Sequence, residues 1–173
     1  IVDDVLVYRF PDYYMVVVNA ANLEKDLEWA QKHLLTDVEL VDESDSTSLL
    51  ALQGPKAEAT LQKITDLDLS RLKFYWLAEG KVDGVDMMVS RTGYTGEPGF
   101  ELCFPRKYSE QIWNAMMQAG AEFDIEPAGL GARDTLRLEV NMNLYGNDID
   151  HTTNPLEARM GWVTKLNKGD FIG

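Results

Sequence analysis

Strand-like and helix-like patterns succeed one another along this chain without a regular alternation, and this order constrains the fold more than any other feature. Residues 1–10 and 13–19 are rich in Val, Leu and Tyr, and Pro11-Asp12 between them predicts a β-hairpin. Further strands are expected at residues 38–41, 48–53, 74–79, 82–91 and 99–104. Helices are expected at residues 22–35, around Ala57, Leu61 and Ile64, at 108–118 and at 128–142. Adjoining hairpins with helices between them favour an α+β fold of antiparallel or mixed sheets with flanking helices over a doubly wound parallel sheet.

A polar, turn-rich stretch at residues 42–47 is the best candidate for a boundary within the chain. It divides the sequence into a strand–strand–helix part at residues 1–45 and a second α+β part at residues 46–173. The chain begins on Ile1 inside an apolar segment and ends on Gly173 after an aromatic–aliphatic pair, which indicates a piece of a longer protein.

The composition excludes several classes of function. With 16 Lys+Arg against 29 Asp+Glu, the formal charge is −13, which argues against nucleic acid as a partner because such binding needs clustered cations. No apolar run approaches the length of about 20 residues that a membrane span needs, so we expect a soluble, intracellular protein with no membrane partner. The single cysteine, Cys103, excludes an internal disulfide and a cysteine-based zinc cage. The two histidines, His33 and His151, are far apart in the sequence, and we expect no metal.

Two glycine-rich stretches resemble nucleotide-binding motifs only superficially. Residues 129–134, Gly-Leu-Gly-Ala-Arg-Asp, lack the third glycine of a dinucleotide fingerprint, and no strand clearly precedes them. Residues 93–99, Gly-Tyr-Thr-Gly-Glu-Pro-Gly, lack the Lys-Ser/Thr of a phosphate loop, and Glu97 would repel a phosphate. The second stretch predicts a tight turn between two strands, which its glycines permit through positive φ angles.

Asp3-Asp4 is unusual because aspartate is depleted in strands. Side chains alternate between the two faces of a strand, so Asp4 is expected to share a face with Leu6 and Tyr8, and only one aspartate can point into a given pocket. A turn or cap at the start of the strand would explain the pair without a functional role. The functional alternative is a carboxylate that accepts a proton or a hydrogen bond from an amine.

Glu101 and Arg133 are two further candidates. Glu101 is expected on one face of its strand with Cys103, while Phe100, Leu102 and Phe104 take the other face. A buried glutamate needs a partner, whereas one at a sheet edge would face water. The helix places Arg133 and Arg137 on one side, where an arginine can hold a carboxylate or a planar polar ring, or form an ion pair with a nearby acid such as Asp134.

Several segments, taken in order, resemble the glycine cleavage system T-protein family, the aminomethyltransferases. They are residues 1–8 with the paired aspartates, 17–22 followed by Glu24-Lys25-Asp26, 51–55 with Gln-Gly-Pro, 90–101, 127–139 continuing to 144–148, Asn154-Pro155, and Gly161-Trp162. The short pieces are weak individually, but the ordered set spans nearly the whole chain. The resemblance implies a folate-binding core with ferredoxin-like and Greek-key parts.

The resemblance also implies a reaction and a site. Such an enzyme moves a methylene group from the aminomethyl-lipoyl arm of the lipoylated H-protein to tetrahydrofolate and releases ammonia, with no metal. Asp4 corresponds to the catalytic carboxylate that positions and activates the folate amine, and Glu101 and Arg133 correspond to the folate-contacting pair. The expected neighbours in the pocket are Tyr8, Asn19, Tyr94 and Trp162.

The sequence departs from the family by truncation, since an upstream part and the C-terminal β-barrel have no counterpart in it. The piece alone could therefore be inactive. Alternatives are the folate-binding domain of a related demethylase or of a sarcosine- or dimethylglycine-oxidising enzyme, and a non-catalytic folate-binding protein. Asp3-Asp4 argues against the demethylase, and the absence of a cysteine in residues 91–97 argues against the non-catalytic protein. The expected location is a bacterial cytoplasm or a mitochondrial matrix.

Overall fold

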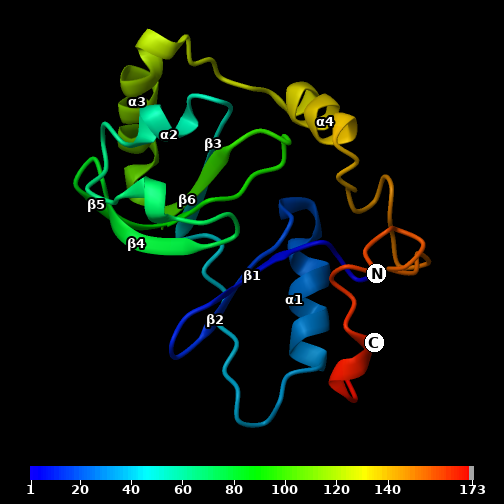
Figure 1. Ribbon diagram of the computed structural model, residues 1–173. Helices are drawn as coiled ribbons and strands as arrows, with labels where there is room; N and C mark the ends of the chain where they lie inside the picture. Colours follow the sequence, from blue (N-terminus) through cyan, green and yellow to red (C-terminus); the bar gives the residue numbers. More distant parts are fainter. Residues whose placement is uncertain (172–173) are drawn as a thin grey trace. The chain divides into compact units, whose positions relative to one another are not determined.

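The computed structural model describes residues 1–171, and the chain forms two compact units (Figure 1). The first unit combines Ile1–Leu40 with Asn143–Gly173, and the second unit is the continuous stretch Val41–Met142. The first unit is therefore built from two segments that lie far apart in the sequence. The domain boundary predicted between residues 45 and 46 stays a prediction.

The first unit begins with the predicted hairpin. Strands β1 (Leu6–Arg9) and β2 (Tyr14–Val17) pair antiparallel, with Tyr8 opposite Met15, and both are shorter than predicted. The short helix η1 (Ala20–Asn22) leads into α1 (Leu23–Lys32). The strand predicted at residues 38–41 is wrong: these residues are exposed, and no strand of the described chain pairs with them.

The two segments of the first unit are joined around the N-terminus. The amino group of Ile1 donates a hydrogen bond to the main-chain oxygen of Thr153 at 2.9 Å. The ammonium of Lys25 lies 4.3 Å from the centre of the Tyr145 ring, which is a favourable cation–π distance. Within the returning segment, Asp150 accepts hydrogen bonds from the main chain and hydroxyl of Thr152, and η5 (Leu166–Lys168) follows near its end.

The second unit is built on a four-stranded sheet in the order β3-β6-β5-β4. Its strands are β3 (Thr47–Gln53), β4 (Leu77–Val82), β5 (Val85–Ser90) and β6 (Gly99–Pro105). All neighbouring strands are antiparallel. Three consecutive strands form a meander, and β3 lies beside the last of them, which is a Greek-key order. The predicted α+β class with antiparallel sheet is therefore confirmed.

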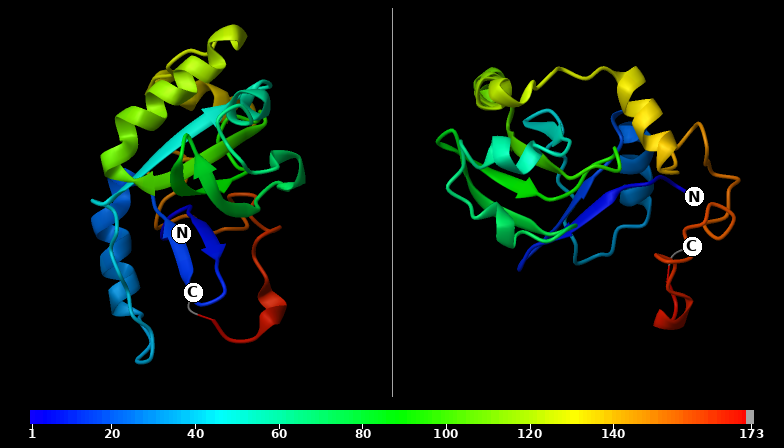
Figure 2. Two further views of the ribbon diagram at one scale, coloured as in Figure 1. Left: turned by 90° about the vertical axis from the view of Figure 1, so that its left-hand side faces the viewer. Right: turned by 45° about the horizontal axis from the view of Figure 1, so that its top comes forward.

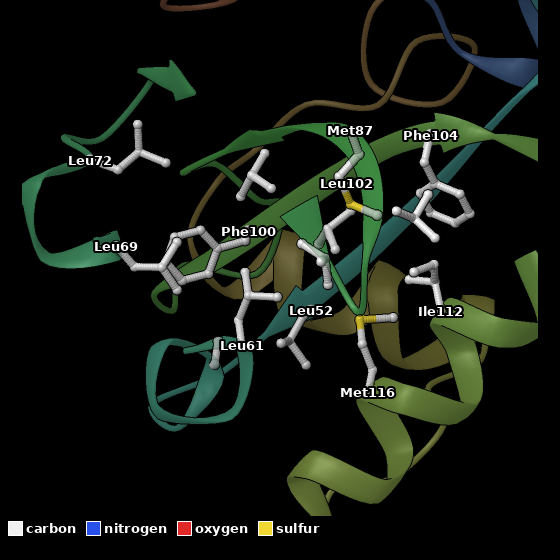
Figure 3. Close-up of a cluster of buried hydrophobic side chains, with 14 residues drawn as sticks. Leu52, Leu61, Leu69, Leu72, Met87, Phe100, Leu102, Phe104, Ile112 and Met116 are labelled. Atoms are coloured by element: carbon white, nitrogen blue, oxygen red, sulfur yellow. The ribbon is translucent and has the colours of Figure 1, made fainter. Parts of the chain in front are cut away.

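One face of this sheet carries the hydrophobic core. Helices α2 (Ala57–Leu61) and α3 (Ser109–Gly120) contribute Leu61, Ile112 and Met116 to one cluster with side chains from the sheet (Figure 3). Two further views show α3 beside the sheet (Figure 2). Each of these elements contributes apolar side chains to the core, so burial of apolar surface stabilises this unit. The sheet residues of the cluster that Figure 3 labels are Leu52, Met87, Phe100, Leu102 and Phe104.

Short helical turns and one longer helix complete the second unit. The turns are η2 (Leu69–Arg71), η3 (Arg106–Tyr108) and η4 (Ala121–Phe123). The helix predicted at residues 128–142 is α4 (Leu130–Glu139), which ends before Asn141, a residue with a positive φ of 58°. No helix within residues 1–171 combines the length and the apolar character needed to cross a membrane.

Candidate active site

Asp3 and Asp4 precede β1, and Asn19 follows β2 on the other side of the hairpin. The pairing of Leu6 with Val17 places Asn19 directly across from Asp4. The Nδ2 group of Asn19 donates to the main-chain oxygen of Asp4 at 2.9 Å, to Asp4 Oδ1 at 3.3 Å and to Asp3 Oδ1 at 3.0 Å. The hairpin therefore brings both carboxylates to one amide.

This geometry corrects one expectation from the sequence, namely that only one aspartate could point into a given pocket. The alternation of faces holds from Val5 onward, where Val5 and Val7 are exposed and Tyr8 is buried. Asp3 lies before the paired region, and its carboxylate folds back to accept a hydrogen bond from the main-chain N–H of Asp4 at 2.8 Å. Strand pairing does not fix side chains outside the ladder, so both aspartates can reach Asn19.

The pKa values of Asp3 and Asp4 are shifted in opposite directions. Burial raises the pKa of Asp4 to about 6, and the negative charge of Asp3 adds to the rise. Burial also opposes ionisation of Asp3, but hydrogen bonds from its neighbours hold the pKa of Asp3 below its ordinary value. Asp4 therefore changes its protonation state close to neutral pH, which suits a group that takes or gives a proton.

Two residues of this cluster were missed by the sequence analysis as site residues. Asn22 occupies the N-cap position of α1 but makes no side-chain cap; its Nδ2 group instead donates to Asp3 Oδ2 at 3.0 Å. Asp26 lies in the first turn of the same helix and is only 8% exposed. The spacing of four residues places Asn22 and Asp26 on one side of the helix, and this is the signal that could have identified them.

Two other predicted neighbours lie in the same unit. Tyr8 is 5% exposed and takes the same face of β1 as Leu6, as the alternation predicts. Trp162 is 68% exposed and lies in a turn, where its main-chain oxygen accepts a hydrogen bond from Lys165. The structure thus brings Asp4 and Asn19 together, whereas most of the surface of Trp162 is open to solvent.

Glu101 belongs to the second unit and lies on β6, an interior strand paired with Ala51 on one side and Ser90 on the other. Its neighbours Phe100 and Leu102 are fully buried in the core on the opposite face, as predicted. The sheet-edge alternative is therefore wrong. Burial raises the pKa of Glu101, and the positive charge of Arg133 works against that rise.

Arg133 and Arg137 differ sharply although they are one helical turn apart on α4. The guanidinium of Arg133 lies 4.4 Å from the centre of the Tyr94 ring, and its side chain is exposed. Arg137 is 1% exposed, pairs with Asp134 at 2.6 Å and donates to the main-chain oxygen of Met142 at 2.8 Å. The anticipated ion pair with Asp134 is thus made by Arg137, and Arg133 remains available.

The glycine-rich loop that carries Tyr94 is held to the sheet by Gln53. Its Nε2 group donates to the main-chain oxygen of Thr92 at 3.2 Å, and Thr95 Oγ1 donates to Gln53 Oε1 at 3.2 Å. A Cβ atom on Gly93 would clash with the Gln53 amide, and of the loop's glycines only Gly96 has a positive φ, of 75°. A side chain at Gly93 would therefore require the Gln53 amide to shift, whereas the backbone conformation itself does not call for glycine there.

Metal and thiol chemistry find little support within the described chain. No group of three or more His, Cys, Asp or Glu side chains in residues 1–171 is arranged to hold a metal ion. Cys103 is buried, and burial together with the charge of Glu101 raises its pKa to about 11, so the thiolate is strongly disfavoured.

Comparison with known proteins shows the family. The family model described as the GCVT N-terminal domain matches residues 1–168. An aminomethyltransferase of Chloroherpeton thalassium is 55% identical over 175 residues and one of Halothermothrix orenii is 49% identical over 174; each alignment covers 100% of this chain but 48% and 49% of the relative. The chain spans about half the length of the curated relatives it matches.

Solved structures agree at the level of the fold. The crystal structure of glycine cleavage system aminomethyltransferase T from Bartonella henselae matches with a TM-score of 0.82 and 34% identity, covering 96% of this chain and 44% of that one. Heterotetrameric sarcosine oxidase from Corynebacterium sp. U-96 matches with a TM-score of 0.58 and 22% identity, covering 74% of this chain and 65% of that chain, which is a likeness of fold alone. This chain belongs to the GCVT N-terminal domain family.

Proposed function

We propose that this chain is the folate-binding core of a glycine cleavage aminomethyltransferase. The protein would move a methylene group from the aminomethyl-lipoyl arm of the H-protein to tetrahydrofolate, with release of ammonia. The names of the relatives support the class of reaction. The observation that carries the proposal is the Asp4 carboxyl, which Asn19 holds in place and whose pKa burial raises to about 6.

Asp4 is the group we assign to the amine of tetrahydrofolate. An ionised Asp4 accepts a hydrogen bond from that amine, orients its lone pair toward the methylene carbon and can accept the proton that the amine loses. Asn19 keeps the carboxylate oriented, because its amide contacts both the main chain and the carboxylate of Asp4. Tyr8 is buried on β1, four residues after Asp4, and we assign it to the folate as a neighbour of Asp4.

Glu101 and Arg133 suit a ligand that presents both donors and acceptors. Among residues 1–171 no donor hydrogen-bonds the half-buried carboxylate of Glu101, and no acceptor pairs with the guanidinium of Arg133. A pterin ring carries an N–H-rich edge that a carboxylate can hold and a carbonyl that an arginine can hold. Tyr94 offers an aromatic face beside Arg133, and we assign Trp162 as a further aromatic contact of the folate.

The remaining assignments follow from the same proposal. The lipoylated H-protein is the partner that would deliver the aminomethyl group, and tetrahydrofolate is the small-molecule co-substrate. A bacterial cytoplasm or a mitochondrial matrix is the location that fits this system. Productive transfer requires the two substrates to meet with water excluded, which the complete protein must provide.

The Asp4→Asn variant of the full-length protein tests the proposal. We expect methylene transfer to fall by about 100-fold or more, because general acid–base assistance contributes about 10²–10⁴-fold. Asp12→Asn, an exposed change in the turn of the same hairpin, is the matched control and should keep the wild-type rate. Equal rates for Asp4→Asn and the wild type would sink the assignment. Tetrahydrofolate binding without any transfer by the wild type would instead indicate a non-catalytic folate-binding protein.

A further inference from the structure

Asp26 is a buried acid that the proposed reaction does not use. It lies in the first turn of α1 and is 8% exposed. Its Oδ1 atom is 2.6 Å from the ammonium of Lys25, but its Oδ2 atom is fully buried, and no donor among residues 1–171 reaches it. A buried oxygen without a hydrogen bond costs free energy, so this atom requires an explanation.

The explanation lies with Asp3, which α1 meets on the side that carries Asp26. Asn22 of the same helix side donates to Asp3 Oδ2 at 3.0 Å, and Lys25 donates both to Asp26 Oδ1 and to the main-chain oxygen of Val2. The mutual shifts in pKa of Asp3 and Asp26 agree with a hydrogen bond between them. Two ionised carboxylates only accept hydrogen bonds, so they cannot bond to each other. Two ionised carboxylates at this separation also repel each other. One proton held between them neutralises this repulsion, and it turns Oδ2 of Asp26 from an unpaired acceptor into a donor.

The surrounding donors decide which of the two acids holds the proton. Asp3 accepts from the main-chain N–H of Asp4, from Asn19 and from Asn22, at 2.8, 3.0 and 3.0 Å. Three donors favour an ionised Asp3. Within the described chain, the one donor to Asp26 is Lys25, which bonds Oδ1 and leaves Oδ2 for the proton. Burial and the hydrogen bond with Asp3 raise the pKa of Asp26 to about 6, in agreement with this division.

We propose that Asp26 carries this proton and is a positioning residue for Asp4. The Oδ2–H group of Asp26 donates to Asp3, Asp3 accepts from Asn19, and Asn19 in turn donates to the main chain and carboxylate of Asp4. The functional part of this inference rests on the proposed role of Asp4. The reaction does not consume this proton, because Asp26 donates it to Asp3 and not to a substrate.

The charged groups around the pair set the direction of its pH dependence. Asp3 faces Asp26 from the N-terminal segment, and Asp4 is the next residue along the chain from Asp3. Lys25 comes from α1, and the ring of Tyr145 covers Lys25 from the returning segment. Loss of the Asp26 proton leaves three carboxylates opposed by one ammonium. Their repulsion would weaken the hydrogen bonds that link Asp3 through Asn19 to Asp4. Activity should therefore decline as the pH rises above the pKa of Asp26.

The first experiment is a carboxyl carbon NMR titration of the wild-type chain, which does not depend on any activity. A free aspartate is already ionised at a pH of about 5. We expect Asp26 to be protonated there while Asp3 is ionised. An ionised Asp26 at that pH overturns the proposal. The titration tests the proton on Asp26 independently of the proposed function. If Asp4→Asn proves fully active, the proposed function fails, but a protonated Asp26 at a pH of about 5 still supports the shared proton.

The second experiment compares two substitutions in the full-length protein. Asp26→Asn keeps a donor in place of the proton and should retain methylene transfer within about threefold, with a weaker alkaline decline. Asp26→Leu removes the donor and should lower kcat by about tenfold or more, because the Asp4 carboxylate is misplaced. Glu24→Gln, an exposed change in the same helical turn, is the control. Equal losses in Asp26→Asn and Asp26→Leu would show that an ionised Asp26 is needed and would contradict the proposal.

Discussion

Asn19 lies across the open end of the β1–β2 hairpin from Asp4, with its amide nitrogen 2.9 Å from the main-chain oxygen and 3.3 Å from the carboxylate of that residue. The same nitrogen also donates to Asp3. One side chain therefore fixes the start of β1 and orients both acids, so its removal should affect stability and activity together.

Asn19→Ala should lower the free energy of unfolding by about 1–3 kcal/mol, because it removes one donor from the carboxylates of Asp3 and Asp4 and from the main-chain oxygen of Asp4. Urea unfolding of the chain measures this change. Methylene transfer by the full-length protein should fall as well, since Asp4 loses the group that orients it. Asn114→Ala, an exposed change on α3, should leave both quantities unaltered. A stable but inactive Asn19→Ala would show that orientation alone matters there.

The two arginines of α4 should respond in opposite ways to substitution. Arg137→Ala should cost about 1–3 kcal/mol of stability, because it removes a buried side chain and leaves the main-chain oxygen of Met142 without that donor. Arg133→Ala should cost less than about 1 kcal/mol, because its side chain is exposed. Tetrahydrofolate affinity should nevertheless fall about tenfold in Arg133→Ala, the loss of one charged hydrogen bond. Chemical unfolding and ligand titration measure the two effects, and unchanged affinity in Arg133→Ala would assign it a surface role.

Gly93→Ala should destabilise the second unit by about 1–3 kcal/mol, because its Cβ atom would displace the amide of Gln53. The loop that carries Tyr94 would shift with it, so folate binding should weaken too. Gly131→Ala is the matched control: its Cβ would meet no atom within 4 Å, and alanine favours the helix. Equal stabilities of Gly93→Ala and the wild type would mean that Gln53 moves aside without cost.

Stability should fall as the pH rises from about 5 to 7.5. Asp4 and Asp26 each have a pKa of about 6 in the folded chain, above their ordinary value of 3.8. The folded state therefore binds their protons more tightly than the unfolded state does, and this contribution, about 2 kcal/mol together, is lost as the pH passes through 6. Urea midpoints across that range measure the slope.

Asp4→Asn should remove part of this pH dependence, because the amide does not titrate, while the exposed Asp12→Asn should leave it unaltered. Asp3 acts in the opposite direction at low pH: its lowered pKa means that stability is lost as the pH falls below 3.8. A rise in stability between pH 5 and 7.5 would contradict the assigned protonation of the cluster.

Periodicity was a good guide wherever a strand or helix borders the apolar core. The alternation around Glu101 was predictable because its neighbours Phe100 and Leu102 must be buried for the sheet to hold α2 and α3. The hairpin was predictable from the turn at Pro11-Asp12. By contrast, residues 38–41 are apolar enough for a strand but have no partner strand in the described chain. A local sequence pattern does not show whether a partner strand will be available.

The side-chain network around Asp4 was harder to predict, because local rules pointed elsewhere. Asn22 in front of a helix is a typical cap, yet Asp3 provides a charged acceptor that competes for its amide. Asp26 in a first helical turn is well explained by the helix dipole, so its second role was hidden. The proposed sharing of a proton between Asp3 and Asp26 requires the hairpin and the helix to meet in space. The spacing of residues along the chain does not predict such a meeting.

The return of the chain to its first unit has a consequence during synthesis. The second unit is one continuous stretch, so its whole core is available once Met142 has left the ribosome. The first unit must wait for later residues, because Ile1 finds its partner only at Thr153 and Lys25 only at Tyr145. The acid that we assign to catalysis, Asp4, therefore lies in the unit that begins before the second unit in the sequence and is completed after it.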